Sequence, residues 1–492
     1  MKAKKEIKTE KIEKVVKQKE LGLTADKDDF TEWFTQLMLK ADLADYTDVS
    51  GCMILKPSSY AVWEKLKLET DKRFKKLGVK NAYFPLFIPE KYLTKEKEHV
   101  EGFAPQVAWV TEAGESKLAE RLAIRPTSET IMYPSYSKWI RSWRDLPLKI
   151  NQWNNVVRWE FAHPVPFFRT REFLWNELHT VLATEKESLQ EGADILEAYD
   201  DVATNEMALY GLAGKKTEKE KFAGAISSTK IHYILPNGRI IEGPCFHYDG
   251  QNFSKAYDIK FLDENGKEQY GFQCTYAIST RMLGTMFAIH SDSKGLIIPP
   301  RMAPNKAVII PILFDDSKEK VLKQANEIAD DLVELDAFVD SRSNYKPGFK
   351  FNEWELKGIP LRIEIGPRDL QNGVVIVARR DTSEKKEVKI KDLKKFCEKA
   401  LVEMQASLLE KSKKLFKSRV ERTSSLDELK KLIEDKKVGI VPMCKNSECE
   451  DKLKAETKGA KAVFISEDKI KGEKCIICKK KAEYMVYAGK TY

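Results

Sequence analysis

The sequence of 492 residues predicts an α+β protein with several domains. Between residues 224 and 284, short β-type runs alternate with Asn-Gly turns, which is typical of an antiparallel meander. Pro299 and Pro300 then interrupt the chain, and strands alternate with helices beyond them. This alternation predicts a small, largely parallel sheet with helices packed on it. Half of the eight cysteines follow near the C-terminal end, so a third kind of unit is expected there.

Within the first 300 residues, apolar residues recur at helical spacing in four segments. Two apolar runs that also carry charges are typical of strands. A further strand, halted by prolines, is expected within residues 78–89. The expected helices are 30–43, 60–77, 128–143 and 186–210, and the expected strands are 150–161 and 174–183.

The alternating pattern after the prolines predicts strands at 306–314, 337–341, 361–365 and 374–378 and helices at 317–334, 391–418 and 425–436. Combined with the change of pattern near residue 300, it divides the chain into four parts. We expect a basic, flexible extension over 1–27, an antiparallel α+β core over 28–300, an α/β unit over 301–405 and a small α+β unit over 406–492.

The formal net charge of +9 is moderate for this length, so any binding surface for a polyanion must be local. Residues 385–419 carry twelve Lys or Arg and five acids, whereas the lysines of residues 1–20 are expected to be a solvated surface. The chain has no apolar run of membrane-spanning length and no apolar signal segment, which predicts a soluble, intracellular protein without a membrane partner. In such a protein, reduced thiols or a metal site are expected rather than disulfides.

Charged residues crowd one stretch that otherwise reads as strand, loop and strand. Arg158 and Glu160 lie two apart on the first strand and can simply pair with each other, but Arg169 and Arg171 return in the loop beside them. In the preceding segment, Arg125–Thr130, Thr127 or Ser128 can equally cap the helix that follows. Because isolated buried charges are costly, the excess of arginines predicts a small, anionic and aromatic ligand.

Together these segments resemble motif 2 of class II aminoacyl-tRNA synthetases, and Arg125–Thr130 resembles the amino-acid-recognition segment of prolyl-tRNA synthetases, most of all those of the archaeal and eukaryotic type. The resemblance extends from about Asp28 to Tyr492. It implies an antiparallel class II catalytic core, an α/β anticodon-binding domain and a small zinc-binding C-terminal domain. The other segments that carry it are Glu101–Pro105, Asp145–Leu148, Gly250–Phe253, Ser279–Gly284, Gly295–Pro304 and Glu364–Asp369.

The resemblance implies that proline attacks the α-phosphorus of ATP and that the prolyl group then passes to the ribose of tRNA(Pro). Positioning and cations supply the rate in such chemistry, with Mg²⁺ bridging phosphate oxygens. Arg158 and Arg281 are the implied catalytic residues, and Arg158 contacts both the α-phosphate and the proline carboxylate. The implied ATP-binding residues are Arg158, Glu160, Arg169, Thr170, Phe173, Glu242, Cys245 and Arg281.

The implied proline site joins an aromatic wall to a carboxylate, which suits an apolar ring that bears an ammonium. His179 and His290 lie in matching segments, but a lone histidine is more often a hydrogen-bonded core residue. The implied proline-binding residues are Thr127, Glu129, Arg158, Trp175 and His247.

Two segments depart from the family pattern: Glu242-Gly-Pro-Cys-Phe-His247 stands for Gln-Gly-Ala-Thr-Ser-His, and Cys274–Ala277 stands for Thr-Ser-Trp-Gly. Glu242 beside a triphosphate adds repulsion unless a cation offsets it. Tyr276 and Ala277 are expected to reshape the floor of the pocket. An altered pocket can admit cysteine or alanine more readily, because one methylene contributes only about 1 to 3 kcal/mol to discrimination.

In the α/β unit, the resemblance implies tRNA contacts at Arg362 and Arg368, to which the basic 385–419 stretch adds phosphate-binding charge. The last unit carries Cys444-x4-Cys449 and Cys475-x2-Cys478, spacings that suit a tetrahedral Zn²⁺ site, although four ordinary thiols remain the alternative. A motif 1 match around Pro85 implies a homodimer, and the family implies a cytoplasmic enzyme. Two alternatives stay open: a synthetase-like paralogue with altered specificity or a non-catalytic RNA-binding role, and a zinc-ribbon nucleic-acid binder limited to the C-terminal block.

Overall fold

The computed structural model describes residues 22–93, 106–160 and 164–492. The predicted extension over 1–27 lies almost wholly outside the described residues, and the Glu101–Pro105 segment lies wholly outside them. Within the described ranges, none of the helices combines the length and the apolar character that a bilayer crossing requires.

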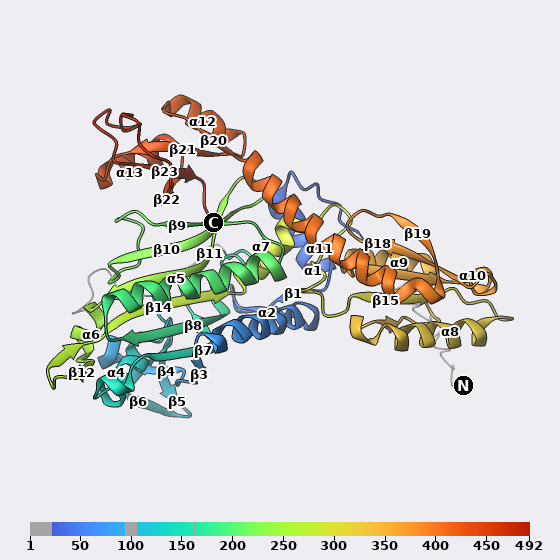
Figure 1. The fold of residues 1–492 in the computed structure, drawn as a ribbon, viewed down its shortest axis with the longest axis horizontal. Coiled ribbons are helices and arrows are strands. Elements are labelled where there is room, and N and C mark those ends of the chain that lie inside the picture. The colour runs from blue at the N-terminus through green and yellow to red at the C-terminus, as the bar shows by residue number, and fades with distance from the viewer. Residues whose placement is uncertain (1–21, 94–105, 161–163) are drawn as a thin grey trace, which may run out of the picture.

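The first unit is built on a seven-stranded sheet in the order β3-β7-β8-β14-β11-β10-β9. Neighbouring strands are antiparallel except β3 and β7, so the predicted antiparallel core is confirmed. Figure 1 shows α5 lying across one face of this sheet. The strands are β3 (Lys80–Asn81), β7 (Leu148–Val157), β8 (Glu172–Leu182), β9 (Leu212–Lys215), β10 (Ser227–Ile234), β11 (Ile240–Gly250) and β14 (Phe272–Ser279).

The helices of this unit begin where the sequence carries start signals. Thr184 and Glu187 form a capping box at the start of α5, and Pro57 occupies the first turn of α2. The helices are α1 (Phe30–Lys40), α2 (Pro57–Lys76), α4 (Glu129–Trp139), α5 (Glu185–Asp201), α6 (Asn252–Tyr257) and α7 (Arg281–His290). Smaller sheets consist of β1 (Ala44–Tyr46) with β2 (Met53–Leu55), of β4 (Phe87–Pro89), β5 (Trp109–Ala113) and β6 (Ser116–Ile124), and of β12 (Lys260–Leu262) with β13 (Glu268–Tyr270).

Two helix predictions in this unit need correction. The helix expected over 186–210 ends as α5 at Asp201 and passes into a π-helical turn, after which Ala208 takes a left-handed conformation (φ 53°) that terminates helical geometry. Helix α6 interrupts the expected meander of residues 224–284, and α7, which begins at its end, was missed. Every residue of α7 after Arg281 is buried, so it lacks the polar face that makes a helix recognisable in sequence.

The second unit contains a five-stranded sheet in the order β16-β15-β17-β18-β19. β15 is parallel to β16 and β17, but β18 and β19 pair antiparallel, so the predicted largely parallel sheet is a mixed one. The link from β17 to β18 contains only the short helix α10, and a parallel crossover needs about a dozen residues or more. The elements are β15 (Ala307–Pro311), α8 (Lys318–Asp331), β16 (Phe338–Val339), α9 (Pro347–Leu356), β17 (Leu361–Ile365), α10 (Pro367–Asn372), β18 (Val374–Arg379) and β19 (Lys385–Lys389).

Helix α11 (Leu393–Ser418) connects the second unit to the third, and Figure 1 shows these units at its opposite ends. The predicted boundary at residues 405 and 406 therefore lies inside a continuous helix. The third unit has a four-stranded sheet in the order β20-β21-β23-β22, and β22 packs beside β9 of the first unit. Its elements are β20 (Val420–Arg422), α12 (Leu426–Glu434), β21 (Val438–Met443), α13 (Ser447–Glu456), β22 (Lys461–Ile465) and β23 (Tyr484–Gly489).

Candidate active site

A cavity of about 220 Å³ opens on the seven-stranded sheet. Strand β8 presents alternate residues to it, which follows from the two-residue repeat of a strand. Arg158 comes directly after β7, and Arg281 is the first residue of α7. The predicted residues that line the cavity are Thr127, Glu129, Arg158, Phe173, Trp175, Glu242, Cys245, His247 and Arg281.

Arg158 is held so that its guanidinium faces an aromatic wall. Its Nε donates to the carbonyl oxygen of Pro126 at 3.0 Å, and its Cζ lies 5.5 Å from the ring centre of Phe173 and 5.1 Å from that of Trp175. The two rings meet edge to face, with an interplanar angle of 83°. A planar cation beside two aromatic rings suits a ligand that is both anionic and flat.

Arg281 adds a second half-buried cation. Its Nε donates to the carbonyl oxygen of Phe168 at 3.2 Å. Burial lowers the pKa of Arg281 most, Glu242 opposes this effect, and the positive charges of Arg169 and Arg158 lower the pKa further. The mutual repulsion of these arginines favours an anion between them.

Other residues of the cavity lining are neutral or acidic. The Thr127 hydroxyl donates to the Glu129 carboxylate, which is buried. His247 Nδ1 lies 2.7 Å from the Ser228 hydroxyl, and the His247 ring packs against Phe222 with ring centres 4.8 Å apart. Burial lowers the pKa of His247 to about 3, and the charge of Lys230 adds to this effect, so the imidazole is neutral.

Glu177, which sequence reasoning missed, organises the floor of the cavity. It accepts hydrogen bonds from the Ser128 backbone N–H at 3.0 Å and from Asn154 Nδ2 at 2.6 Å, and it lies 3.3 Å from His179 Nε2. Burial raises the pKa of Glu177, but His179 and Ser128 outweigh burial and lower it overall. Its position two residues after Trp175 on β8 is the signal that could have found it.

For Ser128, His179 and His290, the sequence allowed a purely structural role as an alternative. The Ser128 hydroxyl donates to Glu177 instead of capping α4. His179 lines the cavity, whereas His290 is a core residue whose Nε2 lies 3.0 Å from the Met207 carbonyl oxygen. Only His290 therefore follows the core alternative away from the cavity.

Glu242 does not stand alone in the cavity wall. Lys216 Nζ donates to Glu242 Oε1 at 2.6 Å, and Lys230 Nζ donates to Glu242 Oε2 at 2.7 Å. We call these three residues the Lys-Glu-Lys cluster. Burial opposes ionisation of Glu242, but the two lysines outweigh it and hold the pKa of Glu242 well below its usual value. The repulsion expected from this glutamate is thus offset by lysines that are distant in sequence.

The other substituted positions differ in their effect. Cys245 and Ala277 line the cavity and are paired across β11 and β14. Burial raises the pKa of the Cys245 thiol, so the thiol is protonated. The Tyr276 hydroxyl, by contrast, donates to Glu191 of α5 at 3.2 Å, and its ring stacks on Phe246. Tyr276 nevertheless lines the cavity, so its expected effect on the cavity floor stays a prediction.

Three predicted nucleotide residues are placed elsewhere. As far as the described residues define it, the cavity lining lacks Glu160, Arg169 and Thr170. Glu160 is exposed in the turn after β7, and Thr170 lines a neighbouring cavity of about 250 Å³. Arg169 is exposed but close enough to affect the pKa of Arg281.

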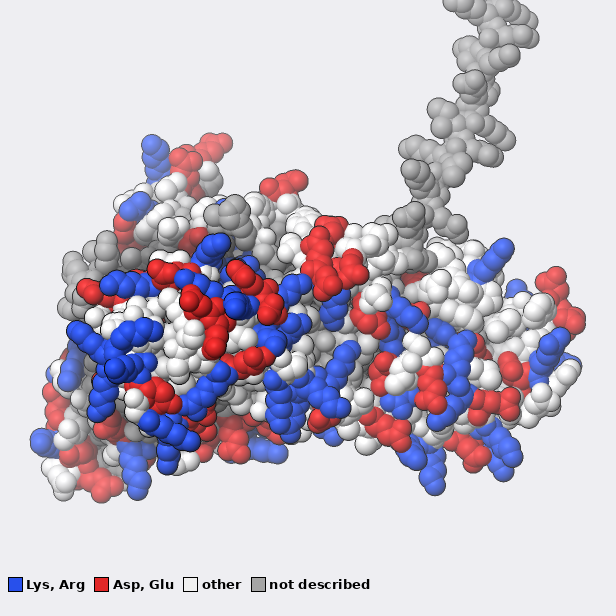
Figure 2. Space-filling view, turned by 90° about the horizontal axis from the view of Figure 1, so that it is seen from above, with Lys and Arg blue, Asp and Glu red and all other residues white. Residues whose placement is uncertain are grey.

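The two predicted tRNA contacts lie at opposite ends of β17. Arg362 donates to Glu364 Oε1 and lies 4.5 Å above the Phe351 ring, in a small cavity that Lys385 also lines. Arg368 is exposed on α10. Figure 2 shows Lys and Arg mixed with Asp and Glu on the face that includes α11, and Lys394 and Lys399 of the basic stretch approach acids.

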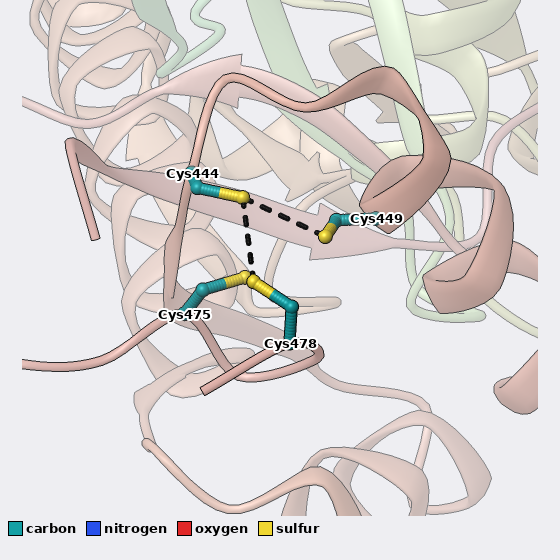
Figure 3. A group of neighbouring side chains, drawn as sticks. All are labelled: Cys444, Cys449, Cys475 and Cys478. Carbon is teal, nitrogen blue, oxygen red and sulfur yellow. Dashed lines mark hydrogen bonds between the residues drawn. The ribbon is translucent and has the colours of Figure 1, made fainter. Parts of the chain in front are cut away.

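The four C-terminal cysteines converge, as Figure 3 shows. Cys444 Sγ lies 3.5 Å from Cys449 Sγ and 3.7 Å from Cys478 Sγ, and all four sulfurs, including that of Cys475, lie within 4.8 Å of one another. Four thiolates about 2.3 Å from one tetrahedral ion are about 3.8 Å apart, so these residues can hold a zinc ion. The Lys480 backbone N–H lowers the pKa of Cys478 to about 7, whereas burial raises the pKa values of Cys444 and Cys449.

The C-terminal unit also contacts a loop of the cavity. Thr217 donates its hydroxyl hydrogen to Glu450 of α13 at 3.0 Å. Lys461 of β22 donates to Glu220 at 2.9 Å, and Glu220 lines the cavity. Glu450 directly follows Cys449 in the sequence, so the cysteine cluster and the cavity loop are joined by one short helix.

Three family models match the chain in the order of its three units. They describe a tRNA synthetase class II core domain (G, H, P, S and T) at 109–290, an anticodon binding domain at 306–400 and a prolyl-tRNA synthetase C-terminal domain at 426–492. The antiparallel sheet and its arginine-lined cavity thus define a class II aminoacyl-tRNA synthetase.

Curated relatives narrow this class. The chain is 43% identical to the proline–tRNA ligase of Natranaerobius thermophilus over 93% of its own length and 94% of the relative, and 44% identical to that of Alkaliphilus oremlandii over 94% and 96%. It is also 42% identical to the bifunctional glutamate/proline–tRNA ligase of Mus musculus over 97% of its length, but it spans only 33% of that protein. The chain belongs to the proline–tRNA ligase family.

A solved structure shares the fold. The crystal structure of prolyl-tRNA synthetase from Cryptosporidium parvum complexed with halofuginone and AMPPNP aligns with a TM-score of 0.90 and 42% identity. The alignment covers 96% of this chain and 97% of that chain. The similarity therefore includes all three units and confirms the predicted fold class.

Proposed function

We propose that this chain is a prolyl-tRNA synthetase, which activates L-proline with ATP and transfers it to the 3′ end of tRNA(Pro). The observation that carries the proposal is the joint lining of one cavity by Arg158, Arg281, Glu129 and Trp175, which come from four separate segments. A relative of the same family was solved with AMPPNP, which supports ATP as the nucleotide.

The proposed chemistry depends on positioning and charge rather than on a covalent group. Arg158 bridges the α-phosphate and the proline carboxylate, so that nucleophile and phosphorus are held together and their charges are neutralised. Arg281 and Arg169 bind the outer phosphates, and Mg²⁺ bound together with ATP would neutralise part of the phosphate charge. Phe173 stacks on adenine, with Glu160, Thr170, Glu242 and Cys245 around the nucleotide.

At the other end of the cavity, Glu129 binds the ammonium of proline and Trp175 covers its ring, with Thr127 and His247 completing the site. The neutral His247 keeps a second cation away from the ammonium. Arg362 and Arg368 contact tRNA, which supplies the acceptor hydroxyl. Zinc held by the four cysteines has a structural role in the C-terminal domain.

We also propose a cytoplasmic homodimer. The dimer is supported by the segment around Pro85 that resembles motif 1, where Tyr83 is 71% exposed and Phe87 is 46% exposed. Exposed aromatic residues of this kind are typical of an interface. Sedimentation of the purified chain tests the dimer, and a monomer at micromolar concentration would contradict it.

Aminoacylation of a tRNA(Pro) transcript with proline and ATP tests the main proposal. We expect prolyl-tRNA from the wild-type chain and a loss of at least about 100-fold for Arg158→Ala. Arg141→Ala, an exposed arginine outside the cavity, serves as the matched control. Absence of any ATP/pyrophosphate exchange in the wild type would favour the non-catalytic RNA-binding paralogue instead.

A second candidate is altered amino-acid specificity, because Cys245 replaces the more polar threonine of the family pattern and Ala277 replaces its smaller glycine, and both line the cavity. Exchange measured with each of the twenty amino acids distinguishes the candidates. Cysteine or alanine activated within about 10-fold of proline would support altered specificity. Proline preferred by a larger margin would end that idea.

A further inference from the structure

The Lys-Glu-Lys cluster carries more positive than negative charge. One carboxylate, Glu242, accepts hydrogen bonds from two ammonium groups, Lys216 and Lys230. Burial lowers the pKa of Lys230, but Glu242 outweighs burial and raises it overall, so Lys230 is protonated. A single carboxylate balances only one of these cations, and the other charge is available to a ligand.

The geometry directs this excess charge into the cavity. The Lys216 side chain is only 1% exposed, whereas those of Lys230 and Glu242 are 21% and 25% exposed, and both line the cavity. Lys230 lies opposite Cys245 in the β10–β11 pairing. Arg281 Nη1 approaches the backbone oxygen of Glu242 at 3.4 Å, so Lys230 and Arg281 flank the same short segment.

We propose that Lys230 is a phosphate-binding residue of this chain, which adds a third cation beside Arg158 and Arg281 for the triphosphate of ATP. Glu242 and Lys216 act as positioning residues. Glu242 fixes the Lys230 ammonium at the cavity wall, and Lys216 fixes Glu242 from the buried side. This inference rests on the proposed function for the identity of the nucleotide.

The cluster explains how a glutamate can stand beside a polyanion. An ammonium is a compact donor that can contact a phosphate oxygen while it keeps one hydrogen bond to a carboxylate. Two lysines on Glu242 leave the local charge at +1, which attracts phosphate rather than repelling it. A purely structural ion pair would need only one lysine for charge balance.

Steady-state exchange with full-length variants tests the proposal. Lys230→Met is expected to raise the KM for ATP by about 10- to 100-fold, because a charge-assisted hydrogen bond is lost, with less than about a threefold change in the KM for proline. Lys230→Arg keeps the charge and should largely restore the ATP KM. Lys215→Met, an exposed lysine on the neighbouring strand, is the matched control and should match the wild type.

Calorimetric titration with AMPPNP separates this inference from the proposed function, because binding is measured without turnover. Weaker AMPPNP binding by Lys230→Met supports the phosphate role even if exchange is absent in the wild type. Unchanged AMPPNP affinity, or equal rises in both KM values, overturns it and leaves a structural ion pair. Thermal melting checks the fold of each variant, and Lys230→Gln, which keeps a polar contact to Glu242, replaces Lys230→Met if that variant unfolds.

Discussion

Replacing Glu242 by glutamine removes one negative charge and almost no volume from the cavity wall. Glutamine keeps one carbonyl oxygen, so it can accept from one lysine but cannot balance the charge of either. The substitution destabilises the Lys216 ammonium most, because the Lys216 side chain is 1% exposed and its Nζ is 2.6 Å from the Glu242 carboxylate. The variant therefore leaves a buried cation without its counter-ion.

The expected cost follows from that burial. Removing one partner of a fully buried pair costs about 3 to 5 kcal/mol. Glu242 and Lys230 are 25% and 21% exposed, so solvent compensates part of the loss and we expect about 2 to 3 kcal/mol. At about 2 to 4 °C per kcal/mol for a domain of this size, the Tm of the catalytic unit should fall by about 4 to 12 °C.

Thermal melting of Glu242→Gln, Lys216→Met and the double variant measures this effect. The double variant should recover part of the stability, because it no longer buries an uncompensated ammonium. Equal Tm values for Glu242→Gln and wild type would refute the reasoning. Strict additivity of the two substitutions would refute it as well, because residues in direct contact must couple.

The pH dependence has a definite sign. The pKa of Glu242 is lower in the folded protein than its ordinary value of 4.5, since the two lysines outweigh burial. The ion pairs therefore stabilise the fold above pH 4.5, and this stability is lost as the pH falls through the lower folded value. The Tm difference between wild type and Glu242→Gln should be constant at neutral pH and narrow below pH 4.5.

Three further predictions concern other parts of the chain. Cys449→Ser removes one of four thiolates, so it should reduce bound zinc from about one ion per chain to a small fraction, as measured by elemental analysis. The control Cys52→Ser should leave the zinc content unchanged. Full zinc retention in Cys449→Ser would argue against the site. Glu129→Gln should raise the KM for proline at least about 10-fold while the ATP KM stays within about threefold, and equal effects on both would contradict its place at the ammonium. Arg368→Ala should weaken tRNA binding and reduce the slope of log affinity against log salt by about 1, and an unchanged slope would exclude a phosphate contact.

Local patterns predicted much of the fold, and the family resemblance pointed to the cavity. The resemblance implied Phe173 and Trp175 as site residues, and both line the cavity together with His179, for which a core role was the expected alternative. The sheet direction in the second unit was not predictable from alternation alone, because it depends on the length of the link between β17 and β18. Helix α7 was missed because an evenly apolar helix has no detectable face.

The Lys-Glu-Lys cluster could not be predicted from the sequence. Lys216 directly follows the edge strand β9, and Lys230 lies on the neighbouring strand β10. Lysines in a chain with so many charges are usually solvated. Only the pairing of β9, β10 and β11 brings them to one carboxylate. Glu242 could be recognised as a departure from the family pattern, but its compensation depends on contacts between residues distant in sequence.

The contact between the C-terminal unit and the cavity loop has a thermodynamic consequence. Glu450 binds Thr217, and Lys461 binds Glu220, so an ion held by Cys449, the residue before Glu450, would be linked through these contacts to a wall of the cavity. Coupling between two binding sites is reciprocal. Suppose that metal binding at the cysteine cluster raises the affinity for proline by some factor. Saturating proline and ATP must then raise the affinity for the metal by an equal factor, and a chelator should remove the metal more slowly. The binding affinities for substrate and for metal would then depend on each other, although the two sites lie in different domains.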